Sequence, residues 1–311
     1  MTARISIVGA GLIGRAWAIV FARAGISVSL YDVDVVALGK VREAIRQSLD
    51  DLQQAGLIED VEAPLSLIQT ENNLARAMAG AEYIQECGPE NVDAKRRIYA
   101  DLEAVAAKDA VLASSTSGIA ASQFTAHLRH PERCLVAHPV NPPYLIPLVE
   151  VVPTLDTSDA AVKSTMLLME QAGQVPILVR KEVQGFILNR LQGALLNEAL
   201  RLFRDGYVSA EDLDKTVKHG LGLRWSFMGP FETIDLNAPS GVIDYGARYG
   251  QLYHAIDQQR GDDNPWDTTT LNALDKERRE RLPSDGLADR QAWRDRRLMA
   301  LMAHQRSISP F

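Results

Sequence analysis

A histidine and a glutamate stand where ionisable side chains are unusual, and together they could remove a proton. His138 closes an apolar run, and the proline-rich segment 139–143 cannot continue as strand or helix. Glu150 lies twelve residues further on, inside the apolar stretch 146–152, where a carboxylate needs a partner. An imidazole held in one tautomer by a carboxylate can take a proton from a hydroxyl group near neutral pH. The pair is a candidate general base, although each residue alone could be a hydrogen-bonded structural group.

Two further polar segments could bind the oxygen of such a hydroxyl group. Residues 114–117, Ser-Ser-Thr-Ser, follow a strand, and ligand-facing loops emerge at that end of a parallel strand. Asn189 lies in the first turn of an apolar helix that begins at Gly185 and runs through Leu202. Its side chain points back toward the preceding segment, so its amide is a second candidate contact. Asn189 could instead only tie its helix to a sheet.

The first 32 residues contain a glycine-rich turn between a strand and a helix. A strand over 5–8 ends at the turn, a helical pattern follows, and a second strand over 27–31 ends in Asp32. The turn itself reads Gly9, Ala10, Gly11, Leu12, Ile13, Gly14. In a dinucleotide fingerprint the three glycines permit the tight turn, the approach of the pyrophosphate and close helix packing. Such a turn alone occurs in many α/β proteins, and the prediction depends on the whole strand, turn, helix and strand order.

Asp32 predicts which dinucleotide binds. It lies eighteen residues after Gly14, close to where the fingerprint places an acidic residue on the adenine-side ribose. A carboxylate accepts hydrogen bonds from the ribose diol and repels a 2′-phosphate, and Val33 and Asp34 supply no compensating cation. The sequence therefore favours NAD over NADP.

Strand patterns and helical patterns keep alternating after Asp32. Helical patterns cover 35–55, 92–107 and a short segment near residue 122, and strand patterns cover 82–85, 110–114 and 134–137. This alternation is typical of a doubly wound α/β sheet of the Rossmann type. The length of 311 residues allows two domains of ordinary size or one large domain.

Composition excludes some classes of function. The formal net charge of −7 opposes nucleic-acid binding, which needs a clustered excess of Lys and Arg. Cys87 and Cys134 fall within or beside strands of one domain, which suits free thiols in a reducing compartment, and we expect a cytoplasmic protein. The first apolar stretch is interrupted by glycines, Arg15 and Arg23, so neither a membrane span nor a signal peptide is expected. No metal site is predicted.

Several strings of the sequence resemble the 3-hydroxyacyl-CoA dehydrogenase family, and the resemblance runs along nearly the whole chain. They are GAGLIG, Asp32, PENVDAK, SSTS, AHPVNPP, PLVEVVP and GFILNRL. Longer strings resemble the lambda-crystallin branch of that family, whose activity is L-gulonate 3-dehydrogenase: AHPVNPPYLIPLVEVVP, KEVQGFILNRLQ, GLGLRWSFMGPFET and RQAWRDRRLMAL. Taken without the family, Glu90 and Lys95 of PENVDAK would be a turn carboxylate and a lysine on a helix surface.

The resemblance implies roles that the residues alone do not give. It implies a catalytic set of Ser117, His138, Glu150 and Asn189. It places Glu90 and Lys95 near the nicotinamide and its ribose, so that the expected cofactor contacts are Gly9, Gly11, Leu12, Ile13, Gly14, Asp32, Glu90, Lys95 and Asn141. It also implies a helical C-terminal domain that forms a homodimer. We accordingly expect an NAD-binding domain over 1–184 and a helical substrate and dimerisation domain over 185–311.

Two features favour a small hydroxy acid over an acyl-CoA thioester. The segment 35–62, which would help hold CoA, has three cations against six acids: Lys40, Arg42 and Arg46 against Glu43, Asp50, Asp51, Glu59, Asp60 and Glu62. Arg224 lies in GLGLRWSFMGP, where the acyl-CoA enzymes have a shorter turn, and its two parallel N–H donors suit a substrate carboxylate. Arg224 could instead be a solvated or interface arginine.

The predicted activity is oxidation of the 3-hydroxyl of L-gulonate or a similar acid, with His138 as base, Glu150 orienting it, and Ser117 and Asn189 on the substrate oxygen. The alternative substrates are 3-hydroxyacyl-CoA, carnitine and 3-hydroxybutyrate. A different class of alternative is a non-catalytic NAD-binding structural protein of the crystallin type, which would need none of the four catalytic residues.

Overall fold

The computed structural model describes residues 4–259 and 264–307, which form two compact units. The first unit comprises Met1–Arg190 together with Arg290–Phe311, and the second comprises Leu191–Asp289. The contacts therefore group residues 185–190 and the chain from Arg290 with the first unit, whereas the sequence-based boundary at 184/185 assigns both to the C-terminal domain. The extreme ends of the predicted domains, residues 1–3 and 308–311, lie outside the described residues.

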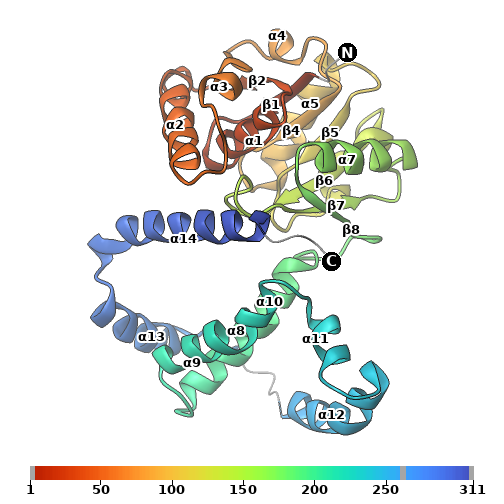
Figure 1. Cartoon of the computed structure of the whole chain (residues 1–311). Coiled ribbons are helices and arrows are strands. Elements are labelled where there is room, and N and C mark those ends of the chain that lie inside the picture. Colours follow the sequence, from red (N-terminus) through yellow and green to blue (C-terminus); the bar gives the residue numbers. More distant parts are fainter. Residues whose placement is uncertain (1–3, 260–263, 308–311) are drawn as a thin grey trace. The chain divides into compact units, whose positions relative to one another are not determined.

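The first unit is built on an eight-stranded sheet with the order β3-β2-β1-β4-β5-β6-β7-β8 (Figure 1). Neighbouring strands are parallel except β6 and β7, which are antiparallel. The order runs outward in both directions from β1, which confirms the doubly wound Rossmann-type fold predicted from the sequence. The strands are β1 Arg4–Val8, β2 Ser27–Tyr31, β3 Ile68–Glu71, β4 Tyr83–Glu86, β5 Val111–Ser114, β6 Cys134–Pro139, β7 Leu148–Pro153 and β8 Val175–Leu178.

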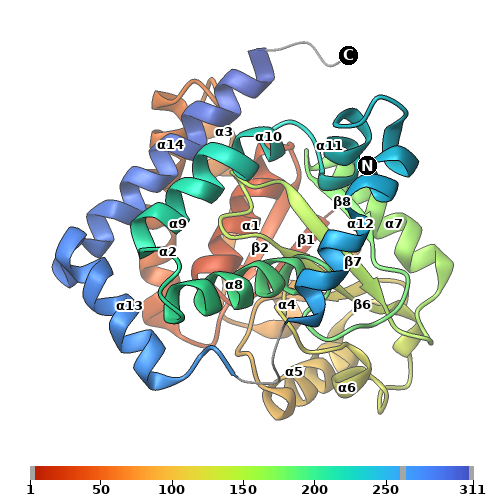
Figure 2. The same ribbon diagram turned by 90° about the horizontal axis from the view of Figure 1, so that it is seen from below.

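Helices cover both faces of this sheet and enclose two apolar cores. Side chains of α1 and α2 join the first core, where α3 packs on α1, while α7 packs on β7 and β8. Helices α4, α5 and α6 bury their apolar side chains in the second core, and α5 and α6 lie together in Figure 2. Their bounds are α1 Leu12–Arg23, α2 Val35–Gln54, α3 Glu62–Ser66, α4 Leu74–Met78, α5 Val92–Val105, α6 Ser122–Thr125 and α7 Asp159–Gln171, with a 3₁₀ turn at Pro131–Arg133.

Strand side chains alternate between the two cores, and this alternation decides where the candidate base points. In β6, Leu135 and Ala137 face the first core and Val136 faces the second. His138 continues the Val136 side because successive side chains of a strand point to opposite faces. Glu150 stands directly opposite His138 in the antiparallel pair of β6 and β7. Both side chains therefore point to the face of the second core.

The last helix, α14 Leu287–Ser307, contributes to the first core. Met299 is buried there, and Leu298, Met302 and Ala303 pack against the same cluster. This burial is why contacts place the chain from Arg290 with the sheet, although it lies more than a hundred residues beyond β8.

The second unit is helical, as predicted for the C-terminal domain. Its elements are α8 Leu188–Arg204, which begins in the first unit, α9 Ala210–Thr216, a π-helical turn Val217–Leu221, α10 Gly222–Trp225, α11 Pro230–Leu236, α12 Gly241–Gln258, α13 Thr268–Arg281 and a 3₁₀ turn Ser284–Gly286. Glu277 of α13 accepts the N–H of Ala210 at 3.0 Å and Arg278 pairs with Asp214 at 3.2 Å, so α13 is fixed to α9. None of the helices formed by the described residues combines the length and apolar character that crossing a membrane requires.

Candidate active site

The residues predicted to bind cofactor and substrate in the first unit gather at one edge of the sheet. Because β1, β2, β4, β5 and β6 are parallel, their carboxyl ends share this edge. Gly9 follows β1, Asp32 follows β2 and Ser117 lies in the loop after β5. β7 runs the other way, so Glu150, near its start, reaches the same edge. Ligands of doubly wound sheets bind outside this edge, where the strand order reverses between β1 and β4.

The glycine-rich turn has the backbone that a dinucleotide requires. Gly9 has a φ of 108°, and a Cβ there would lie 2.8 Å from the carbonyl oxygen of Cys87. A Cβ on Gly14 would lie 1.8 Å from the carbonyl oxygen of Gly9, so only glycine lets α1 pack this closely. A Cβ on Gly11 would meet nothing within 4 Å, which leaves the approach to the turn open. The roles predicted for the three glycines agree with this geometry.

The N-terminus of α1 is suited to a phosphate. Its N-cap is Gly11, no side chain caps it, and its first turn contains no acidic residue. The N–H groups of the first turn of a helix point outward and carry partial positive charge. A cavity of about 550 Å³ adjoins this turn, and Gly9, Gly11, Asp32 and Gly88 are among the residues that line it. The volume of this cavity, the free N–H groups of α1 beside it and its position at the carboxyl edge of the sheet fit NAD.

Asp32 also stabilises the glycine-rich turn by hydrogen bonding to its backbone. One carboxylate oxygen accepts the N–H of Ala10 at 2.7 Å and the other accepts the N–H of Asp34 at 2.9 Å. The carboxylate is thus held against the cavity with lone pairs remaining for a ribose diol. The sequence predicted the ribose contact and did not foresee the bond to Ala10.

His138 and Glu150 form the predicted pair. Nδ1 of His138 lies 2.8 Å from Oε2 of Glu150, and 5% of His138 and none of Glu150 is exposed to solvent. A buried carboxylate at Nδ1 holds the proton on that nitrogen and leaves Nε2 as the free acceptor. Phe186 packs near the imidazole, with the two ring centroids 5.6 Å apart.

Glu150 has a second role that the sequence did not indicate. Its other oxygen accepts the N–H groups of Ile187 at 2.8 Å and Leu188 at 2.9 Å, at the start of α8. Desolvation by burial would raise the pKa of Glu150, but the hydrogen bonds from His138, Leu188 and Ile187 outweigh it, and the pKa lies below its ordinary value. Glu150 is therefore an anion that fixes both the imidazole and the first turn of α8.

The turn before α8 aims these two N–H groups at Glu150. Gly185 and Phe186 both adopt the left-handed region, with φ of 77° and 49°. This conformation costs a residue with a side chain roughly 1 kcal/mol. Phe186 is fully buried in the second core, and that burial holds it there.

Asn189 connects α8 to the loop after β5. Its side-chain amide donates to the carbonyl oxygen of Ser117 at 2.7 Å. Glu150 holds the neighbouring N–H of Leu188, so His138, Glu150, Asn189 and Ser117 belong to one connected group. The structure thus brings together the four residues predicted as the catalytic set. The same bond also ties α8 to the loop that follows β5, which is the structural role considered for Asn189 as the alternative to a substrate contact.

The four hydroxyl groups of residues 114–117 differ in their hydrogen-bond partners. Ser114 donates to Glu86 at 2.6 Å, Ser115 accepts from Gln85 at 2.7 Å, and Thr116 donates to Glu90 at 2.6 Å. Within residues 4–259 and 264–307, the hydroxyl of Ser117 has no hydrogen-bond partner, and the residue is exposed. Ser117 is the hydroxyl of this loop that can meet a substrate.

A buried ion pair beneath this loop was missed by the sequence analysis. Lys95 is 1% exposed, and its ammonium donates to both oxygens of Glu86 at 2.8 and 3.0 Å. The position of Lys95 in the sequence suggests a lysine on the surface of a helix. In the structure its side chain is instead buried. Its nitrogen is 4.0 Å from Glu90, which accepts the N–H of Ser117 at 3.0 Å. Lys95 and Glu90 thus support the Ser117 loop from below, and their predicted cofactor contacts remain predictions.

Two predicted contacts lie outside this connected group. Asn141 is exposed just after β6. Arg224 lies on α10 in the second unit, and no acidic side chain among the described residues pairs with it. Among those residues, no three His, Cys, Asp or Glu side chains gather as a metal site. The roles of Asn141 as a cofactor contact and of Arg224 as a substrate contact stay predictions.

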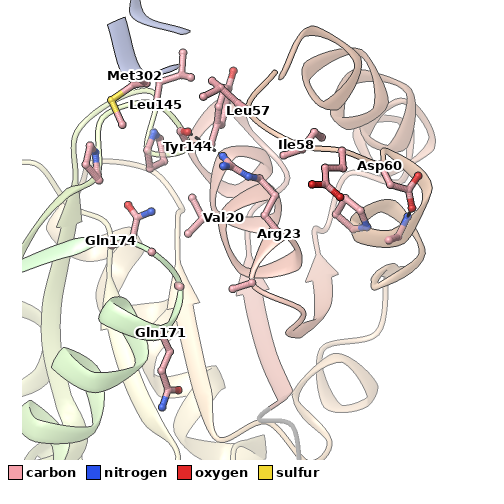
Figure 3. A pocket seen from close by; sticks show the side chains of 18 residues that line it. Val20, Arg23, Leu57, Ile58, Asp60, Tyr144, Leu145, Gln171, Gln174 and Met302 are labelled. Atoms are coloured by element: carbon pink, nitrogen blue, oxygen red, sulfur yellow. Dashed lines mark hydrogen bonds between the residues drawn. The ribbon is translucent and has the colours of Figure 1, made fainter. Parts of the chain in front are cut away.

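The first unit contains a second cavity, of about 510 Å³, which has a different character (Figure 3). Arg23 extends into it and donates to the carbonyl oxygen of Tyr144 at 3.1 Å. Asp60, on its rim, accepts the N–H groups of Glu62 at 2.9 Å and Ala63 at 3.0 Å, which start α3. These charged groups serve the local structure, and no residue of the predicted site lines this cavity.

Comparisons with known proteins agree with this geometry. Residues 4–183 match the 3-hydroxyacyl-CoA dehydrogenase NAD binding domain, and residues 185–279 match the C-terminal domain of the same enzymes. A lambda-crystallin of Oryctolagus cuniculus is 42% identical over 98% of this chain and 97% of its own length. An L-carnitine dehydrogenase of Streptomyces coelicolor is 35% identical over 99% of this chain and 96% of its own length.

A solved structure extends the likeness to the whole fold. It is a 5-formyl-3-hydroxy-2-methylpyridine 4-carboxylic acid 5-dehydrogenase, described as an NAD⁺-dependent dismutase. The TM-score is 0.85 with 26% sequence identity, and the match covers 99% of this chain and 100% of that one.

Proposed function

The chain belongs to the 3-hydroxyacyl-CoA dehydrogenase family of NAD-dependent oxidoreductases, and we propose that it oxidises the 3-hydroxyl of a small free hydroxy acid, L-gulonate first among the candidates. The observation that carries the chemistry is the buried pair of His138 and Glu150, with 2.8 Å between Nδ1 and Oε2. The hydroxyl of Ser117 is exposed, which supports the proposal that a substrate oxygen is held beside this pair.

The residues of the chain act on the proton and on the substrate oxygen. NAD, when bound, supplies the acceptor for the hydride. Nε2 of His138 takes the hydroxyl proton, because Nδ1 is engaged by Glu150. The anionic Glu150 stabilises the imidazolium that forms. The Ser117 hydroxyl and the Asn189 amide hold the same oxygen, and Glu90 keeps the Ser117 loop in place by accepting two hydrogen bonds.

The segment that would hold CoA supports a free acid as substrate. Of its three cations, Arg42 already donates to the carbonyl oxygens of Leu65 at 3.3 Å and Ile68 at 3.2 Å. Arg46 forms a bidentate pair with Glu62. Lys40 therefore remains as the cation of this segment without such a partner among the described residues, and one lysine is a weak site for the phosphates of CoA.

L-Carnitine is a second candidate, because a full-length relative is an L-carnitine dehydrogenase. Carnitine is itself a free 3-hydroxy acid, so the same base and the same carboxylate partner would serve it. 3-Hydroxybutyrate and its CoA thioester complete the set of alternatives within this family.

A substrate panel tests the proposal. NADH formation is followed with L-gulonate, L-carnitine, 3-hydroxybutyrate and 3-hydroxybutyryl-CoA, and kcat/KM is compared because it measures differential binding of the transition states. We expect a free acid, L-gulonate, to have the highest value. A highest value for the CoA thioester would refute the free-acid assignment, and no turnover of any member would favour a non-catalytic NAD-binding protein.

Arg224 is proposed as the partner of the substrate carboxylate. Its lack of an acidic partner among the described residues supports this role, and a π-helical turn, often found near functional sites, immediately precedes α10. Arg224→Leu should raise KM for the preferred acid at least about tenfold, the scale of one charge-assisted bidentate contact, with thermal stability unchanged. Arg248→Leu, which removes an arginine paired with Asp244 in the same unit, is the control and should leave KM unchanged. An unchanged KM in Arg224→Leu would remove the assignment.

We propose a homodimer formed through the C-terminal domain, in the cytoplasm. Large apolar side chains are exposed on the second unit, among them Phe227, Phe231, Leu236 and Ile243. These exposed apolar side chains support an association surface on this unit. Both cysteines are free thiols, which supports a reducing compartment. Light scattering coupled to gel filtration should give twice the mass of the 34.2 kDa chain, and the monomer mass would refute the dimer.

A further inference from the structure

The cavity beside the glycine-rich turn contains a carboxylate to which the dinucleotide fingerprint assigns no role. Much of the cavity wall is apolar and includes Val33, Leu74, Ile98 and Leu102. Two acidic residues interrupt this wall, Asp32 and Asp101. Asp101 comes from α5, nearly seventy residues after Asp32 along the chain, so it lies outside the sequence motif.

The two carboxylates differ in what they bind. Both oxygens of Asp32 accept backbone N–H groups, from Ala10 and Asp34. Asp101 is exposed, and within the described part of the chain its carboxylate has neither a hydrogen bond nor an ion pair. Its charge contributes nothing to the folded structure through such bonds. An unpaired acceptor among the apolar side chains of a cavity wall is suited to bind a donor group of a ligand.

Position along the cavity identifies the part of the dinucleotide that Asp101 faces. Gly11 and the start of α1 mark the pyrophosphate, and Asp32 marks the adenine-side ribose. Tyr31 immediately precedes Asp32 and lines the same cavity. Asp101 lines this cavity as well. Desolvation raises the pKa of Tyr31 and the charges of Asp32 and Asp101 add to it, so both carboxylates lie near this tyrosine. Asp101 is therefore at the ribose end of the cavity, where the adenine base follows the ribose.

We propose that Asp101 accepts a hydrogen bond from the exocyclic amino group of adenine and so selects adenine among purine bases. The apolar side chains of Val33, Leu74 and Ile98 would contact the faces of the ring. Adenine carries an N–H donor at this position, and hypoxanthine carries a carbonyl acceptor there. A carboxylate only accepts, so it attracts the first group and repels the second.

Equilibrium binding measures this selectivity directly. Calorimetry compares NAD with nicotinamide hypoxanthine dinucleotide, in which the amino group is replaced by a carbonyl oxygen. We expect the wild-type protein to bind NAD about fivefold more tightly, the scale of one solvent-accessible hydrogen bond. In Asp101→Asn the ratio should fall to about one, because an amide can donate as well as accept.

The control is Asp93→Asn on the same helix. Asp93 is exposed, lies 3.6 Å from Arg96 and does not line the cavity, so this variant should keep the wild-type ratio. Thermal unfolding verifies that each variant is folded. We expect Asp101→Asn to fold because Asp101 is exposed. A wild-type ratio near one, or an unchanged ratio in Asp101→Asn, would overturn the proposal. The readout involves no substrate, so it leaves the proposed oxidation of a hydroxy acid untouched.

Discussion

Replacing Glu150 with glutamine should abolish most of the activity while the fold persists. Glutamine has the shape of glutamate, and its carbonyl oxygen can still accept the N–H groups of Ile187 and Leu188. Its NH₂ group then faces Nδ1 of His138, where the carboxylate oxygen lay at 2.8 Å. Two donors cannot share this contact, so Nδ1 must become the acceptor and the proton must move to Nε2. The nitrogen that should take the substrate proton is then already protonated.

The size of the effect follows from this change of tautomer. An equivalent aspartate-to-asparagine change behind a catalytic histidine, in a serine protease, lowers kcat about 10⁴-fold. We expect Glu150→Gln to lower kcat/KM by about 10³ to 10⁴, which corresponds to roughly 4 to 5 kcal/mol in the barrier. The three hydrogen bonds lose their charge-assisted character, and the free energy of unfolding should fall by roughly 1 to 3 kcal/mol.

The assay follows NADH formation with the best substrate of the panel, together with urea unfolding. Glu103→Gln is the matched control, because Glu103 also accepts two backbone N–H groups, from Arg129 and His130. It should keep its activity. A Glu150→Gln protein that is folded and within about tenfold of wild-type kcat/KM would refute the role of the carboxylate.

Acid provides a second readout of the same variant. The pKa of Glu150 is lowered by folding from an ordinary value of 4.5, so its ionisation stabilises the protein above that value. The contribution is lost as the pH falls through the lowered pKa. The stability difference between wild type and Glu150→Gln should therefore be full at neutral pH and narrow below about pH 4.5. A difference independent of pH would contradict the charge on Glu150.

Two further predictions concern the ion pair of Lys95 and Glu86 and the two free thiols. Lys95→Met leaves Glu86 buried without its cation and should lower the free energy of unfolding by about 3 to 5 kcal/mol. Adding Glu86→Gln removes the unpaired charge and keeps an oxygen for the Ser114 hydroxyl, so it should recover part of this loss. Lys215→Met, which breaks exposed pairs, is the control, and an equally small change in both would contradict the buried ion pair. Burial raises the pKa of the Cys87 and Cys134 thiols to about 12, so iodoacetamide at pH 8 should label neither in the folded protein and both after denaturation. Rapid labelling before denaturation would contradict the raised pKa of these thiols.

Local patterns in the sequence were sufficient for six of the eight strands and for the candidate base, and they did not indicate β3 and β8. The β-branched run before Gly9 and the acidic end of the next strand predict a parallel pair around a dinucleotide. His138 and Glu150 were predictable as partners because each interrupts an apolar strand, and a buried charge requires a counterpart. Their direct opposition in an antiparallel pair follows from the proline-rich reversal between them.

Long-range contacts were not predictable in the same way. Lys95 has the spacing of an ordinary helix residue, and only the packing of α5 into the second core shows that it meets Glu86. A glutamate at the end of a buried strand, followed nine residues later by a lysine in a helix, was the available signal. The apolar side chains of α14 gave no indication of which core they join. Asp101 carries no motif, and only the cavity identifies it.

Binding and turnover measured together in His138→Gln test the central claim most directly. Loss of the imidazole removes the base and leaves the glycine-rich turn, Asp32 and the cavity intact. The dissociation constant for NAD should stay close to that of the wild type, and turnover should fall at least about a hundredfold. His130 is half-buried and pairs with Glu132 at 3.1 Å, and His130→Gln should change neither quantity. Wild-type turnover in His138→Gln would contradict the assignment of His138 as the base.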